Sequence, residues 1–340
     1  MPVRDEEPFI RTSLEAVFAQ DYPAGRIEVI VADGMSTDGT RNIIRALQAA
    51  HPKLFLIDNP GRIVPTGLNA ALARAKGDII IRVDGHCKVA PDYVRRCVDH
   101  LERDHVDAVG GPIVTVGETP AARVIAAATS SFFGVGGSAF RTTSDMTGFS
   151  DTVPFPAYTR DIIERAGPYD EELVRNQDDE YNYRLRKLGA KVLLASDVRS
   201  VYFSRSSLKT LWRQYFQYGY WKVRVMQKHP RQMSPRHFVP AAFLAVLGVA
   251  LLAAPFVRFG DYLLVAVAGS YVAATVLATF LAGRGVPPAL LPLLPGAFAT
   301  IHLAYGLGFL VGLVKFRDRW RDASPPRHTV ARGVQGTGHH

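Results

Sequence analysis

The chain has 340 residues, 48% of them hydrophobic, and a formal net charge of +9. This length allows a soluble domain of ordinary size together with a further segment. The positive charge accumulates beside an apolar region, which favours a membrane surface as its partner, and we expect no binding to nucleic acid.

The cysteines and the first residues indicate the compartment. Only Cys87 and Cys97 are present, so no disulfide framework is expected, and free thiols agree with a reducing cytosol. Residues 1–7 are polar and predict no signal peptide. Insertion into a membrane would then depend on the C-terminal half of the chain.

Helices and strands are predicted to alternate along the first 200 residues. Apolar side chains at helical spacing predict helices over residues 8–20, 40–50, 66–76, 91–103, 161–166 and 180–188. Runs of β-favouring apolar residues predict strands over residues 27–32, 54–57, 79–83, 106–110 and 191–195. Strands that alternate with helices of this length predict an α/β domain with a Rossmann-like, mostly parallel sheet.

The strand over residues 79–83 is interrupted only by Arg82 and is expected to be buried on both faces. It ends in Asp84, Gly85 and His86. Ligands of open α/β sheets bind outside the carboxyl ends of the strands. Asp84 and His86 could therefore share one divalent ion whose other ligands are diphosphate oxygens. The alternative for His86 is a structural role, since most histidines are not metal ligands.

Two further groups of acids precede helices. Asp33 ends the strand over residues 27–32, and a carboxylate there can accept hydrogen bonds from a nucleobase or ribose. The alternative at this turn is that Thr37 or Asp38 caps the next helix. Residues 177–180 read Gln-Asp-Asp-Glu, which by themselves are more typical of a solvated face or of the acidic start of a helix.

The second half of the chain changes in composition. Residues 117–152 are rich in small residues and are expected to form a mobile loop. Apolar runs over residues 238–257, 262–283 and 297–314 are about as long as the roughly 20 residues that cross a bilayer, and predict about two to four membrane segments. The basic side chains before them are expected to face anionic lipid; they are Arg205, Lys209, Arg213, Lys222, Arg224, Lys228, Arg231 and Arg236.

The number of membrane crossings is left open by the charges that flank them. Three spans that start inside would leave the basic residues 315–321 outside, against the positive-inside tendency. Either the last segment is re-entrant, or the proline-rich part between residues 285 and 296 forms a short extra crossing. The basic tail over residues 315–340 is expected to be disordered.

Taken together, these motifs resemble the inverting glycosyltransferase family 2, whose catalytic domain has the GT-A fold. The resemblance extends to about residue 222. It rests on the motifs at residues 22–23 and 28–40, on Asn69 with residues 75–78, on Asp84-Gly85-His86 at the place of the family's Asp-x-Asp motif, and on Gln177-Asp178 at the place of its usual Glu-Asp. Residues 82–86 look most like succinoglycan-type exopolysaccharide glucosyltransferases with C-terminal membrane helices. We therefore expect a GT-A domain over residues 1–222, a basic juxtamembrane linker over 223–237 and a transmembrane region over 238–314.

The resemblance also implies roles for individual residues. The residues implied to bind the nucleotide are Asp33, Asp38, Asn69 and Asp84. Asp84 and His86 are implied to be ligands of a metal ion. Because imidazole suits manganese better than magnesium, we predict a preference for Mn²⁺ over Mg²⁺. Asp178 would be the general base of a single in-line displacement, with Asp179 as the alternative.

Residues 217–221 resemble the Gln-x-x-Arg-Trp motif of processive members. Gln217 and Trp221 are therefore expected to contact the acceptor, although Trp221 could equally be an interfacial aromatic residue. Tyr220 stands in the place of the arginine, which argues against processive polymerisation. The family's first apolar strand is missing before the turn at residues 2–7, so either the start is placed too late or the sheet lacks a central strand, which should destabilise the nucleotide pocket.

The expected activity is transfer of a sugar from a UDP-sugar to a polyprenyl-diphosphate-linked acceptor in exopolysaccharide or cell-envelope glycan synthesis. The enzyme would be a multi-pass protein of the cytoplasmic (inner) membrane, with its catalytic domain in the cytosol and membrane lipids around its C-terminal helices. The alternatives are a polyprenyl-phosphate glycosyltransferase and a non-catalytic sugar-nucleotide-binding assembly protein.

Overall fold

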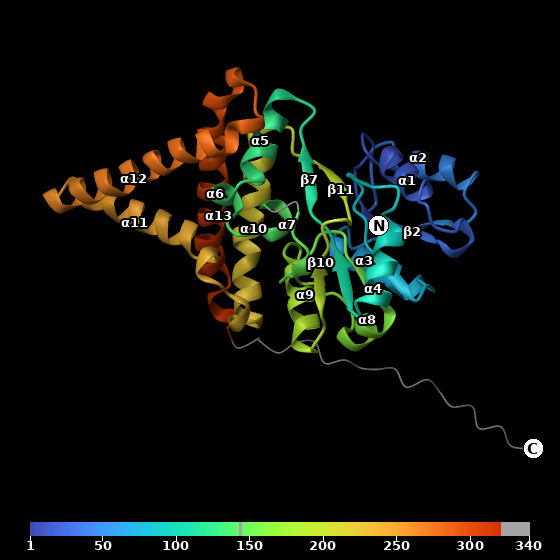
Figure 1. The fold of residues 1–340 in the computed structure, drawn as a ribbon. Helices are drawn as coiled ribbons and strands as arrows, with labels where there is room; N and C mark the ends of the chain where they lie inside the picture. The colour runs from blue at the N-terminus through green and yellow to red at the C-terminus, as the bar shows by residue number, and fades with distance from the viewer. Residues whose placement is uncertain (143–144, 321–340) are drawn as a thin grey trace, which may run out of the picture.

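The computed structural model describes residues 1–142 and 145–320 (Figure 1). The helices are α1 Ile10–Phe18, α2 Thr40–Gln48, α3 Val64–Arg74, α4 Tyr93–Arg103, α5 Pro120–Thr129, α6 Phe132–Val135, α7 Ala139–Thr142, α8 Arg160–Ala166, α9 Gln177–Lys187, α10 Leu208–Lys228, α11 Val239–Ala253, α12 Arg258–Ala282 and α13 Leu294–Lys315. The strands are β1 Pro2–Val3, β2 Val29–Asp33, β3 Leu54–Asp58, β4 Ile79–Ile81, β5 Cys87–Val89, β6 Ala108–Gly110, β7 Ile113–Val116, β8 Gly148–Phe149, β9 Ala157–Thr159, β10 Val192–Leu194 and β11 Ser200–Phe203.

The predicted α/β domain is confirmed, and its strands form three sheets. The order is β1-β2-β3 in a parallel sheet, β4-β9-β6-β10-β8 in a second sheet and β5-β11-β7 in a third. The second and third sheets are mixed, because β9 runs antiparallel to both β4 and β6, and β11 runs antiparallel to β5. Helices pack against these sheets, and the largest buried cluster includes Leu14, Val31, Tyr93, Cys97 and Val109.

Strand β4 differs from its prediction in burial. Its three isoleucines are half-buried, whereas the apolar run predicted a strand covered on both faces. Among the described strands, β4 pairs only with β9 and stands at the edge of its sheet. An edge strand has no neighbouring strand to cover its outer side, which explains the exposure.

Strand β1 occupies the place where the family's first strand was expected to be missing. Its two residues pair in parallel with Ala32 and Asp33 at the end of β2. The ammonium group of Met1 donates a hydrogen bond to the Ile30 carbonyl at 2.8 Å. The turn at residues 4–7 is thereby held beside the end of β2, where the cavity described below begins.

The prediction of a mobile loop over residues 117–152 is wrong. This segment contains α5, α6, α7 and β8 among its described residues. Thr119 caps α5 by accepting a hydrogen bond from the Ala122 amide at 3.2 Å. Val124 and Ile125 are buried in a cluster shared with α13. Small residues that composition alone assigns to a loop allow α5 to pack closely against other helices here.

Helix α10 joins the α/β domain to the C-terminal helices. It packs along α13, and α5 stands beside both (Figure 1). The predicted boundary between residues 222 and 223 falls inside α10, so the catalytic domain and the apolar region share a continuous helix.

The contact between α10 and α13 depends on glycines at which the two backbones meet. A Cβ atom at Gly219 would lie 2.0 Å from the Tyr305 carbonyl oxygen, and one at Gly308 would lie 2.1 Å from the Phe216 carbonyl oxygen. Both distances are too short for any real contact. The missing side chains therefore set the distance between the helices.

We expect Gly308→Ala to separate α10 from α13 and to destabilise the protein by about 1–3 kcal/mol, the usual cost of overpacking. The measurement is the melting temperature of the purified protein in detergent. Gly296→Ala in the same helix is the control, because nothing lies within 4 Å of a Cβ atom there. Equal melting temperatures for the two variants would contradict this packing.

Three of the basic residues of α10 that were expected to face lipid, Lys222, Arg224 and Lys228, turn towards the α/β domain, while Lys209 and Arg213 are exposed. Arg224 is fully buried and donates to both carboxylate oxygens of Glu172, at 2.8 and 3.0 Å. Lys228 pairs with Asp170 and with Glu172. Burial would raise the pKa of Glu172, but its hydrogen bonds to Arg224 and Lys228 outweigh burial and lower the pKa to about 2. These cations tie α10 to the α/β domain, so the predicted linker over residues 223–237 begins as a buried part of a helix.

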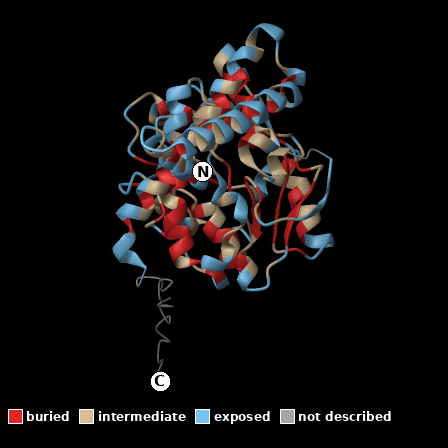
Figure 2. Ribbon diagram, turned by 90° about the vertical axis from the view of Figure 1, so that its left-hand side faces the viewer, coloured by how far each residue is buried: buried red, intermediate tan, exposed pale blue. Residues whose placement is uncertain are grey.

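Two helices of the described chain are long and apolar enough to cross a membrane, over Arg258–Gly285 and Pro288–Lys315, and Val239–Ala253 is a shorter apolar helix. Helices α11 and α12 project as a hairpin from the rest of the protein (Figure 1), and much of their surface is exposed (Figure 2). Their exposed apolar side chains include Val249, Leu252, Phe256, Phe259, Val265, Val272, Leu277 and Phe280. Helix α13, in contrast, buries nine residues against α5, α10 and α11. The predicted disordered tail lies outside the described residues from position 321 onward.

Candidate active site

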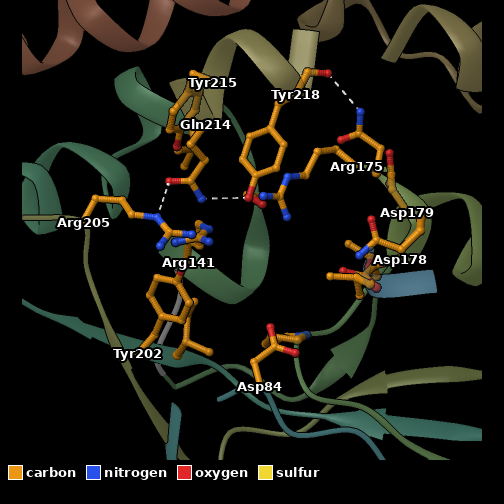
Figure 3. A pocket seen from close by; sticks show the side chains of 18 of the residues that line it. Asp84, Arg141, Arg175, Asp178, Asp179, Tyr202, Arg205, Gln214, Tyr215 and Tyr218 are labelled. Carbon is orange, nitrogen blue, oxygen red and sulfur yellow. Dashed lines mark hydrogen bonds between the residues drawn. The ribbon is translucent and has the colours of Figure 1, made fainter. Parts of the chain in front are cut away.

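One cavity of about 1430 Å³ connects the α/β domain with the C-terminal helices. Its wall includes the N-terminal turn, the end of β4, residues 132–141, residues 174–179, one face of α10 and side chains of α11, α12 and α13. Figure 3 shows Asp84 and Asp178 facing the same space from different segments of the chain. The structure thus brings together the predicted residues Asp84, His86, Asp178 and Asp179.

Arg82 links the two central carboxylates. Its Nε atom donates to Asp84 Oδ1 at 3.0 Å, and its Nη1 atom donates to Asp178 Oδ1. Arg82 is 9% exposed, while the side chains of Asp84 and Asp178 are 22% and 43% exposed. A guanidinium group with fixed, planar donors therefore holds the predicted metal ligand and the predicted base in one arrangement.

The ion pair changes the acidity of Asp84. Burial would raise the pKa of this carboxyl group, but the charges of Arg82 and His86 outweigh burial, and the pKa is lowered. Asp84 is therefore ionised at neutral pH and can serve as a ligand for a cation.

His86 is oriented by a second acid. Its Nδ1 atom lies 2.8 Å from Glu6 Oε1, and its ring packs edge-on against Tyr202 with the ring centroids 5.1 Å apart. A carboxylate on one ring nitrogen is the usual way in which a protein fixes a metal-binding histidine, because it leaves the other nitrogen available as a ligand. Glu6 was not predicted as a site residue, although it lies in the turn at residues 2–7 already singled out from the sequence.

The donor set fits a cation that is held partly by its substrate. No group of three or more His, Cys, Asp or Glu side chains able to hold a metal occurs in residues 1–142 and 145–320. Mg²⁺ and related ions in nucleotide sites are commonly bound by one or two protein ligands together with phosphate oxygens. Asp84 and His86 both line the cavity and fit this pattern.

Asp179 is paired separately from Asp178. Its carboxylate pairs with the buried ammonium group of Lys222 on α10. Burial would raise the pKa of Asp179, but Lys222 outweighs burial and lowers it. Asp178 is paired with a buried cation too, but it shares Arg82 with Asp84, and its side chain is more exposed than that of Asp179, 43% against 31%. The greater exposure favours Asp178 over Asp179 as the base.

The segment before α9 is held in place by Asn176. This residue has a left-handed backbone with a φ of 63°, which asparagine tolerates better than most residues. Its side-chain amide donates to the Tyr218 carbonyl of α10 at 2.9 Å. The position of Asp178 is therefore set jointly by the start of α9 and by α10.

Asp33 does not reach the cavity. Its carboxylate is fully buried and accepts hydrogen bonds from the Ser36 hydroxyl at 2.5 Å and from Arg41 Nη1 at 2.6 Å. The neighbouring Gly34 does line the cavity. In this structure Asp33 shapes the turn that brings Gly34 to the cavity, and the predicted direct contact with a nucleotide stays a prediction.

Asp38 and Asn69 also lie away from the cavity wall. Asp38 accepts hydrogen bonds from the Thr40 amide at 3.0 Å and from the Glu7 amide at 3.1 Å, so it organises the start of α2 as the alternative interpretation proposed. The Asn69 side chain bonds the backbone of Tyr169 and the Glu171 carboxylate. The structure gives both residues structural roles.

Gln217 and Trp221 are not among the residues that line the cavity, and their expected contact with the acceptor stays a prediction. Trp221 donates from its indole nitrogen to Gln217 Oε1 at 3.0 Å, and it packs against Phe316 after α13. The face of α10 that lines the cavity is offset by part of a helical turn. It carries Gln214, Tyr215, Tyr218 and Lys222.

Comparisons with known proteins agree with this geometry. Residues 1–161 match the family profile described as "Glycosyl transferase family 2". The chain is 32% identical over 332 residues to the succinoglycan biosynthesis protein ExoA of Rhizobium meliloti (strain 1021), which covers 94% of this chain and 95% of that protein. It is 30% identical over 236 residues to a dolichyl N-acetyl-alpha-D-glucosaminyl phosphate 3-beta-D-2,3-diacetamido-2,3-dideoxy-beta-D-glucuronosyltransferase of Methanococcus voltae, covering 67% of this chain and 73% of that protein.

A solved structure supports the same fold. The mannosyltransferase PcManGT from Pyrobaculum calidifontis, in complex with GDP-Man and Mn²⁺, superposes with a TM-score of 0.56 and 21% sequence identity, over 92% of this chain and 86% of that chain. At this identity the likeness concerns the fold.

Proposed function

The chain belongs to glycosyltransferase family 2, with a GT-A catalytic domain, and we propose that it is an inverting enzyme that transfers a sugar from a UDP-sugar to a polyprenyl-diphosphate-linked acceptor. The observation that supports this most strongly is the single cavity. It reaches from the N-terminal turn, past Asp84 and Asp178, to side chains of three apolar helices. Such a space can hold a water-soluble donor and a lipid-linked acceptor together.

The residues of the cavity divide the reaction between them. The donor would lie beside Gly34, Arg62 and Asp84, where the backbone turns and the charges suit a nucleotide diphosphate. Asp84 and His86 would hold a divalent ion, which when bound neutralises charge on the departing diphosphate. Arg82 keeps Asp84 in position for this role through its hydrogen bond.

Asp178 would act on the acceptor. As the more exposed of the two neighbouring acids, it can accept the proton of the attacking hydroxyl group as that oxygen forms its bond to the anomeric carbon. A single displacement of this kind breaks the bond to the diphosphate on the opposite face of the sugar and inverts the anomeric centre. Arg82, which is shared with Asp84, holds the carboxylate of Asp178 in place through an ion pair.

Attachment to a membrane follows from the same geometry. The exposed apolar side chains of the α11–α12 hairpin would be covered by lipid, and the cavity wall continues onto these helices. The catalytic domain would then lie at the cytosolic face of the inner membrane. Nucleotide sugars from the cytosol would reach it there. The name of the Methanococcus voltae relative, which specifies a dolichyl-phosphate-linked sugar, supports a lipid-linked acceptor. The name of the succinoglycan biosynthesis protein supports a role in glycan synthesis.

The test is a turnover assay on the full-length protein in detergent. We expect UDP release when a panel of UDP-sugars is combined with a polyprenyl-diphosphate-linked sugar, with faster release in Mn²⁺ than in Mg²⁺ and none in EDTA. GDP-sugars and undecaprenyl phosphate are the comparison donor and acceptor. Turnover only with undecaprenyl phosphate would support the polyprenyl-phosphate alternative. Binding of UDP-sugars without any turnover would support a non-catalytic protein.

A further inference from the structure

Three of the cavity's arginines that have no acidic partner among the described residues are grouped around one space. Arg141 comes from α7, Arg175 from the segment before α9 and Arg205 from the segment before α10. Figure 3 shows their side chains around one space, opposite Asp84 and Asp178. Within residues 1–142 and 145–320, none of them forms an ion pair with an Asp or Glu side chain. All three are partly buried, so their charges are only partly screened by solvent.

Each acid in the cavity wall already has a basic partner. Asp84 and Asp178 share Arg82, and Asp179 has Lys222. At the N-terminal turn Asp5 pairs with Arg4, and Glu6 pairs with His86. In all, eight Arg and Lys side chains and five Asp and Glu side chains line the cavity, so it has an excess of positive charge. An anion brought by a substrate would balance this charge.

Neighbouring side chains hold two of these arginines in place but leave most of their donors free. The Nε atom of Arg205 donates to Gln214 Oε1 at 3.3 Å, and Gln214 donates in turn to the Tyr218 hydroxyl at 2.9 Å. The guanidinium group of Arg141 lies over the Tyr202 ring, 5.6 Å from its centroid. Terminal N–H groups that are oriented in this way suit the oxygens of a phosphate group, which arginine binds through two parallel hydrogen bonds.

The cavity wall becomes apolar towards the C-terminal helices. The side chains there are Phe133, Val135, Phe243, Tyr271, Ile301 and Tyr305. The network around Arg205 ends on α10, the helix that packs against α13. A nucleobase could cover only a short part of this apolar wall. A phosphate carried on a long hydrocarbon chain has a charged group for the arginines and an apolar group for the rest of the wall.

We infer that Arg141, Arg175 and Arg205 bind the diphosphate of an isoprenoid-linked acceptor, whose hydrocarbon chain leaves along the apolar wall. The inference rests on the proposed function for the identity of the acceptor. It assigns the phosphate-recognising residues of the acceptor to segments separate from Asp84 and His86, the residues proposed for the donor side.

The test uses direct binding, so that it does not depend on turnover. Farnesyl diphosphate is the probe, titrated calorimetrically into the full-length protein in detergent with EDTA, so that a metal at Asp84 cannot contribute. We expect Arg141→Gln/Arg205→Gln to weaken binding of farnesyl diphosphate at least tenfold, while UDP binding in Mn²⁺ changes less than twofold. Farnesol, which lacks the diphosphate, should bind the wild type and the variant equally.

Two variants make the outcome interpretable. Arg213→Gln, an exposed arginine on α10 outside the cavity, should leave both affinities unchanged. Arg141→Lys/Arg205→Lys keeps the charges and should lose only part of the affinity, which a folding defect would not produce. Unchanged binding of farnesyl diphosphate in the glutamine variant would overturn the inference. Equal weakening of UDP would overturn it as well, because the arginines would then serve the donor. Intact binding of the probe without turnover would count against the proposed function alone.

Discussion

Replacing Asp178 with asparagine is expected to lower kcat by about 10²–10⁴-fold, the usual contribution of a general base. Asparagine has nearly the same shape as aspartate but cannot accept the proton of the acceptor hydroxyl group. The KM for the nucleotide sugar should change little, because the donor is proposed to contact Asp84 instead. Steady-state kinetics with saturating acceptor, together with equilibrium binding of UDP, measure both quantities.

The neighbouring acid provides the matched control for this prediction. Asp179→Asn removes a carboxylate that is paired with Lys222, and we expect it to affect stability more than kcat. The reverse result, with a large loss of kcat only in Asp179→Asn, would transfer the role of base to Asp179. Full activity of both variants would show that neither Asp178 nor Asp179 is the general base.

Replacing Arg82 with methionine is expected to lower kcat/KM by about 10²-fold, because a displacement of about 1 Å at reacting groups costs that much. Arg82 is the only residue in the described part of the chain that contacts both Asp84 and Asp178 through hydrogen bonds. Its loss would free the two carboxylates to move apart. Since both are partly exposed, the cost in stability should be about 1–3 kcal/mol, below that of breaking a fully buried pair.

The same variant should change the pH dependence. In the wild type the pKa of Asp84 is lowered because Arg82 and His86 outweigh burial. The interactions of Asp84 with Arg82 and His86 therefore stabilise the folded protein at pH values above the pKa that Asp84 has in the unfolded chain. This stabilisation is lost as the pH falls through the lower pKa that Asp84 has in the folded protein. Without Arg82, burial raises the pKa, so the acid limb of kcat/KM should move to higher pH. Profiles of kcat/KM between about pH 4 and 8 measure this shift.

Arg11→Met is the control for Arg82, because Arg11 forms an exposed ion pair with Glu15 on α1 and does not line the cavity. We expect its activity, pH profile and melting temperature to match those of the wild type, since exposed pairs contribute little. An unshifted acid limb in Arg82→Met, with Asp84 still required for activity, would contradict the proposed control of Asp84 by Arg82.

The central acids of the site were predictable because each occupies a position that local pattern reveals. Asp84 and His86 follow an apolar strand, and Asp178 and Asp179 stand at the start of a helix. Elements of an α/β fold bring such positions to one edge of the sheet. The resemblance to a family then ordered these motifs, and the structure placed all four residues in the wall of one cavity.

The partners of these acids were not predictable, because they come from distant parts of the chain. Glu6 meets His86 across 80 positions of sequence, and Lys222 meets Asp179 across 43. No local periodicity records such pairings. Asp33 shows the converse: its place at the end of a strand suggested a ligand contact, yet Arg41 and Ser36 enclose its carboxylate.

The helix α10 shows how composition can mislead. Its lysines and arginines precede an apolar region and suggested contact with lipid, but Arg224 and Lys228 turn inward to Glu172. Gln217 and Trp221 matched a motif, but the helical phase turns Gln214 and Tyr218 to the cavity instead. In both cases the deciding fact is which face of the helix packs on α13, and that contact depends on glycines whose role appears only in three dimensions.

The anomeric configuration of the transferred sugar tests the central claim most directly. It is read from the proton coupling of the anomeric centre in the lipid-linked product, after turnover with an α-linked UDP-sugar. A single displacement assisted by Asp178 predicts a β-linked product. An α-linked product would show retention, and would contradict the mechanism proposed for this cavity.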